Sequence, residues 1–337
     1  MSGEFPHIVI DELTVGYHPG KDQKILISGF SGQLIPGETI ALMGSNGSGK
    51  STLLRTITGS QRQLSGKVLL NGKSISGLSM REKARYISYV STEPVRVGNM
   101  SVFDLVGLGR YLYSGAWGSL SANDIAVVNQ CIELTGMKGF EYRQMNGLSD
   151  GERQRCMIAR ALAQDTPVII LDEPTAFLDV RNKYEIIHLL RKLAAEQGKS
   201  IIFSSHDFSI SLGMADKIWL IKNEKLVEGA PEDLALQNHF QSLFEGSPIA
   251  FHPESGEVIM AEPLMRGIQI DAPANLRGWI VKAMQRKGVF EDTASVVKLV
   301  AKEAGGETLF FLEKDGKTSK YTSVYSLLKD DFFSSFV

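Results

Sequence analysis

Cysteine is nearly absent from this chain of 337 residues, which carries only Cys131 and Cys156. The two lie at unrelated positions, so the sequence offers neither a disulfide framework nor the spacing of a metal site. Isolated cysteines of this kind are typical of a protein in a reducing compartment. We expect both to be small, buried, hydrophobic side chains.

Long apolar runs and an excess of basic residues are missing as well. No apolar run in the sequence approaches the ~20 residues that are needed to span a bilayer. The opening residues, MSGEFPHIVIDEL, have neither the basic head nor the apolar core of a secretory signal. Lysine and arginine number 36 against 38 acidic residues, which gives a formal net charge of −2. This balance argues against a bulk nucleic-acid-binding protein and leaves only local basic patches open.

The residues that are present have the composition of a globular protein, with 43% hydrophobic and 22% charged. The length exceeds one ordinary domain and suits a large domain with a smaller one. We find no internal repeat and no low-complexity segment.

Over the first 249 residues, short apolar runs alternate with stretches of helical spacing. Strands are expected at residues 8–13, 25–26, 39–43, 66–70, 168–171 and 200–204, with a hairpin of 218–221 and 225–228. Helices are expected at residues 50–58, within 102–137, at 151–164 and at 184–197. The alternation predicts an α/β core with a largely parallel sheet, and the strand-rich start predicts an antiparallel portion beside it.

Residues 250–337 differ in character, and we expect them to form a small α+β accessory domain. A helix is expected there whose apolar stripe consists of Leu276, Trp279, Ile280 and Met284. Three strands are expected at residues 296–302, 308–312 and 317–322, followed by a short helix at 324–329. Trp279 and the pair Phe332-Phe333 are expected in a core or an interface. The role of this domain stays open between regulation, dimerisation and passive packing.

Residues 44–51, GSNGSGKS, fit the phosphate-loop (Walker A) pattern GxxxxGK[ST] between an expected strand and an expected helix. Glycines let the backbone wrap around phosphate oxygens, and the helix presents its positive end. Lys50 supplies a charge near the outer phosphates, and the Ser51 hydroxyl is a ligand for Mg²⁺. The predicted nucleotide contacts are Gly44, Ser45, Asn46, Gly47, Ser48, Gly49, Lys50, Ser51 and Thr52.

Two acids, Asp172 and Glu173, directly follow the apolar run 168–171. Open α/β sheets bind their ligands at this carboxyl end of the strands. We predict that Asp172 holds Mg²⁺ through water and that Glu173 polarises the attacking water. His206 follows a second apolar strand, where we predict that it contacts the terminal phosphate.

Together these residues resemble the ATP-binding subunits of ABC transporters, over roughly residues 7–250. Residues 148–155, LSDGERQR, resemble the family signature LSGGQ, and residues 176–179 resemble its D-loop. His206 matches the switch histidine, and Tyr17 matches the aromatic residue that stacks on adenine. The resemblance implies a phosphate-loop ATPase core with an antiparallel β subdomain and a helical subdomain.

The resemblance also implies a mechanism that uses ATP and Mg²⁺. A second copy is expected to face the first head to tail, with each ATP held between the phosphate loop of one copy and Ser149 and Gly151 of the other. Closure of the pair is expected to drive separate transmembrane permease subunits. The stretch from Ser149 to Glu152 also fits a helix capping box, and the two interpretations are compatible.

A narrower likeness concerns residues 102–110 and 163–173, which are similar to the ATPases of iron-siderophore, haem and vitamin B12 importers. It implies import of a metal chelate, with the chain attached peripherally to the cytoplasmic face of a bacterial inner membrane. A periplasmic or lipoprotein substrate-binding protein is the further partner that it implies, and nucleic acid is not expected. The cargo itself would be recognised by those other chains.

The sequence departs from the family at two places. Thr92 takes the position of the Q-loop glutamine, from which its hydroxyl can still reach Mg²⁺ or water, and Glu93 is an alternative substitute. In the signature, Asp150 stands where glycine is usual and Glu152 where glutamine is usual. Acids favour a helix start but repel phosphates, and Arg153 and Arg155 are candidates to offset them.

Two other functions compete with transport. The first is an ABC ATPase with a regulatory or assembly role, which a single phosphate loop and the lack of a heptad array argue against. The second is a degenerate cassette that binds ATP but hardly hydrolyses it. Thr92 and Asp150 favour that interpretation. The retained phosphoryl-transfer residues oppose it, namely Lys50, Asp172, Glu173 and His206.

Overall fold

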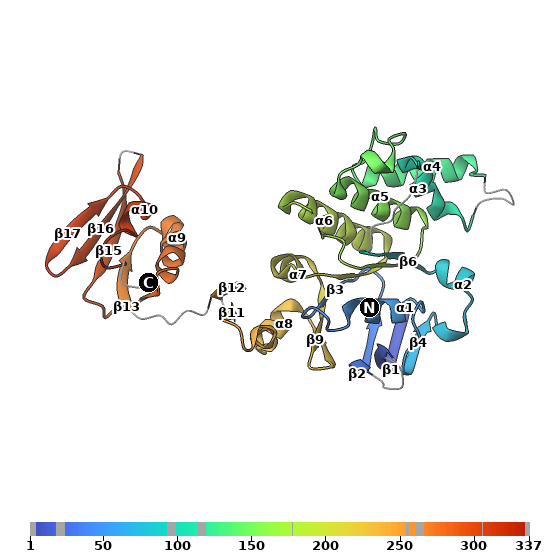
Figure 1. Ribbon diagram of the computed structural model, residues 1–337, viewed down its shortest axis with the longest axis horizontal. Coiled ribbons are helices and arrows are strands. Elements are labelled where there is room, and N and C mark those ends of the chain that lie inside the picture. The colour runs from blue at the N-terminus through green and yellow to red at the C-terminus, as the bar shows by residue number, and fades with distance from the viewer. Residues whose placement is uncertain are drawn as a thin grey trace. The chain divides into compact units, whose positions relative to one another are not determined.

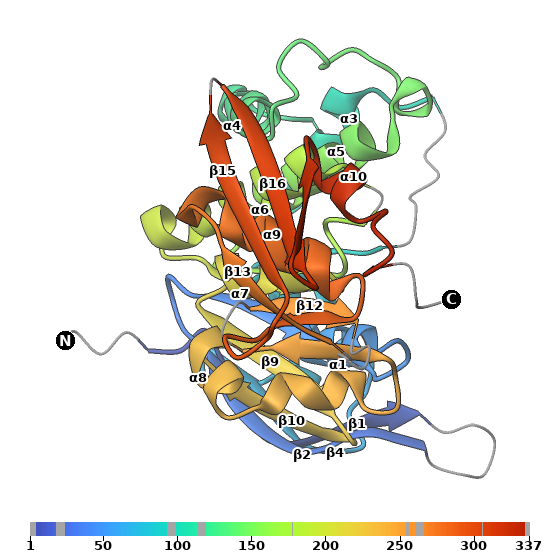
Figure 2. The ribbon, with the colours of Figure 1, turned by 90° about the vertical axis from the view of Figure 1, so that its left-hand side faces the viewer.

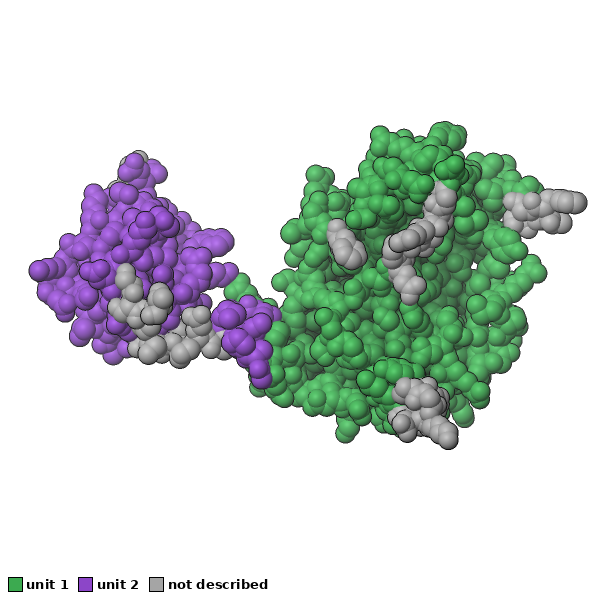
Figure 3. All heavy atoms as spheres, viewed as in Figure 1, with its two compact units in different colours: residues 1–245, 251–257 green, residues 246–250, 258–337 purple. Residues whose placement is uncertain are grey.

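The computed structural model describes residues 5–17, 24–92, 99–113, 119–176, 178–253, 256–260, 266–304 and 306–333. The chain divides into two compact units, one of residues 1–245 and 251–257 and one of residues 246–250 and 258–337 (Figure 3). The predicted boundary between residues 249 and 250 lies inside a short strand, β11 (Ile249–His252), at which the chain changes unit.

A six-stranded sheet of order β10-β9-β3-β8-β7-β6 forms the centre of the first unit. Its members are β3 (Thr39–Met43), β6 (Ile87–Val90), β7 (Val168–Leu171), β8 (Ser200–Ser204), β9 (Lys217–Lys222) and β10 (Lys225–Gly229). All neighbours run parallel except β10, which pairs antiparallel with β9. Parallel strands end at one edge of their sheet, so the residues after β3, β6, β7 and β8 are brought together there.

A four-stranded antiparallel sheet of order β2-β1-β4-β5 covers one side of this core. It consists of β1 (Ile8–Tyr17), β2 (Lys24–Leu34), β4 (Ser65–Leu70) and β5 (Lys73–Ser74), and β2 lies beside β10 (Figure 2). Helix α1 (Lys50–Ile57) packs into the apolar core that these strands share with the central sheet. In that core the Trp219 ring is fully buried, 4.9 Å from Phe30 in an edge-on contact, and its indole N–H donates to Glu228.

Helices cover the other side of the central sheet, and their apolar faces form a second core. Three of them, α3 (Val102–Gly107), α4 (Ala122–Leu134) and α5 (Asp150–Ala163), pack against one another (Figure 1). The others are α6 (Val180–Gln197) and α7 (Phe208–Met214). Cys131 and Cys156 are buried in this core as expected, and burial raises their thiol pKa values to about 11 and about 12.

Serine caps recur at the helix starts. Helices α2 (Met80–Ala84), α3, α4 and α5 each begin directly after a serine. The serine hydroxyl accepts a hydrogen bond from the backbone N–H of the third helical residue, which is an acid, and the carboxylate of that acid accepts one from the serine N–H. Each reciprocal pair satisfies two N–H groups that would otherwise have no partner. Four local sequence signals therefore fix where these helices begin.

An aromatic cluster ends the first unit. Helix α8 (Pro231–Leu236) leads to a 3₁₀ segment, η4 (His239–Phe244), and β11 pairs with β12 (Glu257–Met260). The rings of Phe208, Phe240 and Phe251 meet with centroids 5.0–5.2 Å apart, and Phe244 lies 5.9 Å from Phe208. Shorter 3₁₀ segments are η1 (Ile75–Gly77), η2 (Leu108–Arg110) and η3 (Met145–Gly147).

The second unit is a five-stranded sheet of order β14-β13-β15-β16-β17, packed against helices α9 (Ala274–Gln285) and α10 (Val324–Leu327). Its strands are β13 (Arg266–Asp271), β14 (Val289–Glu291), β15 (Lys298–Ala304), β16 (Glu307–Lys314) and β17 (Lys317–Tyr321). Phe332 and Phe333 lie in its core as expected. Trp279 does not lie in this core, because α9 buries Ile280, Ala283 and Met284 and leaves Trp279 72% exposed, and its place in an interface stays a prediction.

Within the described parts of both units, no helix has the length and apolar character needed to cross a bilayer.

Candidate nucleotide-binding site

The predicted phosphate loop connects β3 to α1. Gly47 and Gly49 have φ angles of 77° and 104°, in the left-handed region that glycine tolerates. A Cβ on Gly49 would lie 2.9 Å from the Cβ of Leu26, so packing also requires glycine there. The Lys50 ammonium folds back and donates to the Gly44 and Ser45 carbonyl oxygens, at 2.9 and 3.2 Å. Burial lowers its pKa, whereas Glu173 and Asp172 oppose that shift.

A cleft of about 290 Å³ opens beside this loop. Residues of the loop and α1 line it together with one residue from each of four other parts of the chain. The full set is Tyr17, Leu26, Asn46, Gly47, Gly49, Lys50, Ser51, Thr52, Glu173 and His206. Residues far apart in the sequence thus meet around one space. Ser45 and Ser48 line a neighbouring cleft of about 270 Å³ on the β9–β10 side, together with Gly47.

Asp172 lies directly after β7 and is 2% exposed. Its Oδ1 accepts a hydrogen bond from the Ser204 hydroxyl at 2.7 Å, and its Oδ2 accepts one from the Tyr89 hydroxyl at 3.4 Å. Burial and the nearby Asp172 carboxylate raise the pKa of Tyr89 to about 12, although Arg55 opposes the shift. Tyr89 therefore keeps its proton at neutral pH and acts as a donor to Asp172.

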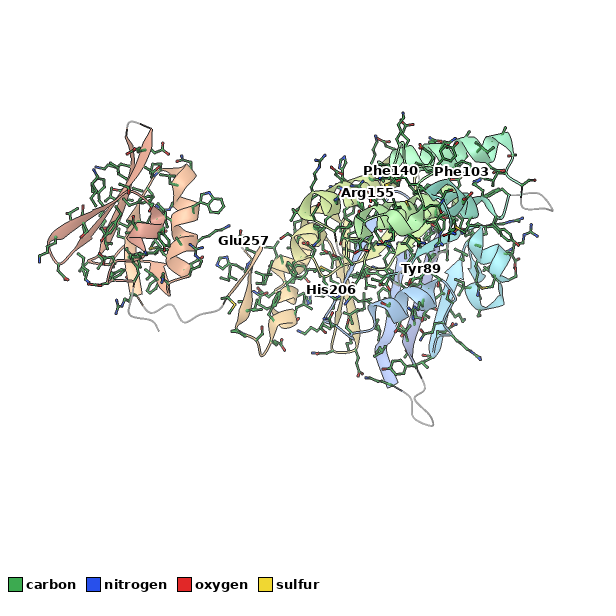
Figure 4. All side chains as sticks on the ribbon, turned by 45° about the horizontal axis from the view of Figure 1, so that its top comes forward. Tyr89, Phe103, Phe140, Arg155, His206 and Glu257 are labelled. Carbon is green, nitrogen blue, oxygen red and sulfur yellow. The ribbon has the colours of Figure 1, made fainter. Side chains whose placement is uncertain are left out.

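Glu173 adopts a left-handed backbone conformation, with φ of 50°. Its amide donates to the Ser204 hydroxyl at 2.8 Å, and its Oε1 lies 2.7 Å from His206 Nε2. Tyr89 on β6 and His206 just beyond β8, both labelled in Figure 4, contact Asp172 and Glu173 respectively from the strands that flank β7. The predicted pair of Glu173 and His206 is thus in direct contact at the cleft.

Thr92 reaches the same region by a different contact from the one expected. Its hydroxyl donates to the backbone carbonyl of Asp172 at 3.2 Å. The contact links the end of β6 to the end of β7, next to the predicted cation site. Glu93, the alternative substitute for the glutamine, lies outside the described residues.

The predicted signature lies at the start of α5, and its residues do not line the cleft of their own chain. The Glu152 carboxylate accepts from the Ser149 amide at 2.7 Å and the Ser149 hydroxyl at 2.9 Å, which lowers its pKa. This reciprocal bonding is the capping box that the sequence predicted. Gly151 follows in the first turn of the same helix.

The two arginines of the signature behave differently. Arg153 pairs with Asp150 at 3.1 Å, as expected. Arg155 instead donates to the Thr135 carbonyl at 3.0 Å, to Asn182 at 2.6 Å and to Glu185 at 2.7 Å, which joins α5 to the end of α4 and the start of α6. The prediction that Arg155 offsets the Asp150 charge is therefore wrong.

Tyr17 ends β1 and is 43% exposed, with Lys24 Nζ 5.8 Å from its ring centroid. The ring lines the main cleft and also a neighbouring one with Gly16 and residues 61–64. An exposed aromatic face at the rim of a cleft is available for stacking on a base.

The donors around the cleft fit a hard divalent cation. Ser51 and Glu173 line the cleft and offer a hydroxyl and a carboxylate, and the buried Asp172 carboxylate adjoins Glu173 in the sequence. Oxygen ligands of these kinds are the ones that Mg²⁺ prefers. In the described residues no cluster of three or more histidine, cysteine, aspartate or glutamate side chains is able to hold a metal by itself. A cation here would share its coordination shell with phosphates and water, as Mg²⁺ commonly does.

Comparison with known proteins places this arrangement in a family. Residues 27–176 match the family described as ABC transporter. An ABC transporter ATP-binding protein of Methanocaldococcus jannaschii is 39% identical over 236 residues, which cover 70% of this chain and 80% of that protein. This chain belongs to the ABC transporter family. It is an ATP-binding subunit that hydrolyses ATP.

Other ABC transporter subunits are similar along most of their length. The achromobactin transport ATP-binding protein of Dickeya dadantii is 39% identical, covering 66% of this chain and 82% of that protein. The iron(3+)-hydroxamate import ATP-binding protein of Bacillus subtilis is 31% identical, covering 70% and 86%. A dimeric ATP-binding cassette bound to ADP and phosphate superposes with a TM-score of 0.61 at 25% identity, covering 66% of this chain and 98% of that one. The predicted ABC ATPase fold is thereby confirmed.

Proposed function

We propose that this ATPase energises the import of a metal chelate, such as an iron-siderophore, haem or a cobalamin-like compound, through separate membrane subunits. The observation that carries the site assignment is the contact of Glu173 with His206 at the cleft that Lys50 and Ser51 also line. The choice of cargo is supported by the relatives named for achromobactin transport and iron(3+)-hydroxamate import.

In the proposed mechanism, the phosphate loop holds ATP with its inward N–H groups and the Lys50 ammonium neutralises phosphate charge. Ser51 and Asp172 would hold Mg²⁺, which when bound offsets the charge on the phosphate oxygens. Glu173 would orient the attacking water and accept its proton. His206 would fix the Glu173 carboxylate and contact the terminal phosphate, and Tyr17 would stack on adenine.

We further propose that two copies close head to tail around ATP. Ser149 and Gly151 do not line the cleft of their own chain, so they are available to the nucleotide of a second copy. Ser149 caps the positive end of α5, and a helix N-terminus attracts phosphate. The Asp150 charge is compensated by Arg153, which reduces its repulsion of a partner's phosphate.

The remaining parts of the proposal concern partners. Permease subunits would convert closure of the dimer into substrate movement, and a periplasmic or lipoprotein binding protein would deliver the chelate. The chain would then act at the cytoplasmic face of a bacterial inner membrane. Support comes from the import function named for the relatives and from the absence of a membrane-spanning helix in the described residues.

The first test is ATP hydrolysis by the wild type beside Glu173→Gln, with oligomeric state followed by size in ATP. We expect the wild type to hydrolyse and the variant to accumulate as an ATP-bound dimer, because it binds ATP but lacks the group that accepts the proton. Equal hydrolysis by both would contradict the role of Glu173.

The cargo requires a second test in cells. We expect a strain lacking this protein to lose uptake of radiolabelled ferric hydroxamate, with recovery by the wild type and no recovery by Lys50→Ala. Lys83→Ala is the matched control, since Lys83 also donates to a backbone carbonyl but does not line the cleft. Normal uptake without the protein would exclude this cargo and leave the ATPase assignment standing.

A further inference from the structure

Ser204, the last residue of β8, is a fully buried serine whose hydroxyl touches both predicted acids. Its Oγ lies 2.7 Å from Asp172 Oδ1 and 2.8 Å from the Glu173 backbone nitrogen. The direction of both bonds is fixed, because the Glu173 amide can only donate. The hydroxyl therefore accepts from Glu173 and gives its own hydrogen to Asp172.

Strand register puts Ser204 at this point. In the parallel pair of β7 and β8, Leu171 stands opposite Phe203, so the next position along each strand brings Asp172 beside Ser204. Ser204, which follows the three apolar residues 201–203 of β8, is thus placed where β7 ends. No motif in the sequence marks it.

The two bonds constrain the two acids in different ways. The bond to Oδ1 fixes the rotation of the Asp172 carboxylate, whose other oxygen accepts from Tyr89. The bond from the amide holds Glu173 in its left-handed conformation, which costs roughly 1–2 kcal/mol for a residue with a side chain. The Ser204 hydroxyl therefore fixes both the orientation of the Asp172 carboxylate and the backbone conformation of Glu173.

We propose that Ser204 is a positioning residue for ATP hydrolysis, which couples the orientation of Asp172 to that of Glu173. The inference rests on the roles proposed above for these two acids. Ser204 does not line the cleft, and in this proposal it acts by holding the Asp172 carboxylate and the Glu173 backbone in place. Residues that orient a ligand-bearing side chain typically change metal affinity or activity by about 10–100-fold when removed.

A buried serine can also matter for stability alone, and the same strand supplies a control. Ser200, at the other end of β8, is likewise fully buried and makes two hydrogen bonds. Its Oγ donates to the Ile35 carbonyl at 2.7 Å and lies 2.8 Å from His7 Nδ1. Ser200→Ala therefore measures how much stability is lost when a buried hydroxyl is removed from β8 without changing the contacts of Asp172 and Glu173.

The test compares Ser204→Thr with Ser204→Val in the full-length chain, because threonine and valine differ by one hydroxyl at nearly constant shape. We expect Ser204→Thr to hydrolyse ATP near the wild-type rate and Ser204→Val to lose kcat by about 10–100-fold, with little change in KM. Ser200→Ala should lower the Tm and leave kcat unchanged.

Binding of a fluorescent ATP analogue provides a readout independent of turnover. Without Mg²⁺, all variants should bind it with wild-type affinity. As Mg²⁺ is added, Ser204→Val should need a higher Mg²⁺ concentration for half of the fluorescence change, since the shorter of the two hydrogen bonds to the Asp172 carboxylate is lost. Equal kcat in Ser204→Thr and Ser204→Val, or an equal loss in Ser200→Ala, would overturn the proposal.

Glu173→Gln, measured in the same series, separates this inference from the function on which it rests. If Glu173→Gln loses hydrolysis while Ser204→Val keeps it, only the role of Ser204 is wrong. If Glu173→Gln hydrolyses at the wild-type rate, the assignment of the acids fails and the role of Ser204 fails with it.

Discussion

Around Asp172, three hydroxyl groups hold the residue in place. Tyr89 and Ser204 donate to its two oxygens, and Thr92 donates to its backbone carbonyl. Neutral donors orient a carboxylate without cancelling its charge, so the acid stays available to a cation. The sequence predicted the acids but not Tyr89 or Ser204, because their contacts join strands that lie far apart along the chain.

Thr92→Gln tests whether this position is that of the Q-loop glutamine. We expect hydrolysis to be preserved or raised, because the longer glutamine side chain extends toward the cation and the attacking water. This gain should outweigh the loss of the hydrogen bond from the Thr92 hydroxyl to the Asp172 carbonyl, worth about 1 kcal/mol. Steady-state ATP hydrolysis is the measurement, with Thr92→Val as the control that removes only the hydroxyl. Loss of activity in Thr92→Gln with Thr92→Val still active would mean that the loop is aligned wrongly.

Local sequence signals located most elements of the first unit. The apolar runs 168–171 and 200–204 gave β7 and β8 with their observed bounds. Asn-Gly and Asp-Gly are typical hairpin-turn pairs, and Asn71-Gly72 in the first unit and Asp315-Gly316 in the second both have positive φ angles at both residues. Tight turns and buried parallel strands depend on a few neighbouring residues, which is why a single sequence predicts them well.

Elements whose pattern is weak were missed or misplaced. Strand β13 (Arg266–Asp271) has only two buried apolar residues, Ile268 and Ile270, and was not predicted. On α9, helical spacing fits an apolar stripe that includes Trp279 as well as it fits the buried stripe of Ile280, Ala283 and Met284. Periodicity alone does not say which face of the helix meets the sheet. Tertiary packing determines which face is buried, so this face could not be predicted from the sequence alone.

At the element scale, the start of α5 carries two roles that a matched pair of variants can separate. Ser149 and Ser79 both form capping boxes with a glutamate three residues on. We expect Ser149→Ala and Ser79→Ala each to cost about 1 kcal/mol of stability. Only Ser149→Ala should also weaken ATP-dependent dimerisation in a Glu173→Gln background, because only α5 is proposed to meet a second copy's nucleotide.

Urea unfolding and size-exclusion chromatography in ATP measure the two effects. If both variants dimerise like their parent, Ser149 is a helix cap and nothing more. If Ser79→Ala is equally impaired in dimerisation, the loss reflects general destabilisation.

Over the whole molecule, every residue that lines the cleft belongs to the first unit, and so does Phe251, although it lies beyond the predicted boundary. Phe251 is 3% exposed and packs on Phe208, at the start of the helix that follows His206. The first unit thus needs a short piece of chain that sequence composition assigned to the accessory domain.

Two truncations test where the ATPase ends. We expect a chain of residues 1–260 to keep ATP hydrolysis and the Tm of the first unit. A chain of residues 1–245 should be less stable, since it loses the burial of Phe251, worth about 1.5–3 kcal/mol. Thermal unfolding and hydrolysis rates decide the matter. Equal stability of the two would show that the aromatic cluster contributes little, and loss of hydrolysis by 1–260 would mean that catalysis requires the accessory domain.

The opposite surroundings of Trp219 and Trp279 give each unit its own optical reporter. Trp219 lies in the dry core between the two sheets of the ATPase, and its emission should be blue-shifted and shielded from iodide. Trp279 stands in water on the accessory domain, where iodide should quench it readily. The third tryptophan of the sequence, Trp117, is first replaced by phenylalanine so that only these two emit. Quenching during a urea titration should then show whether the two units unfold together or one after the other.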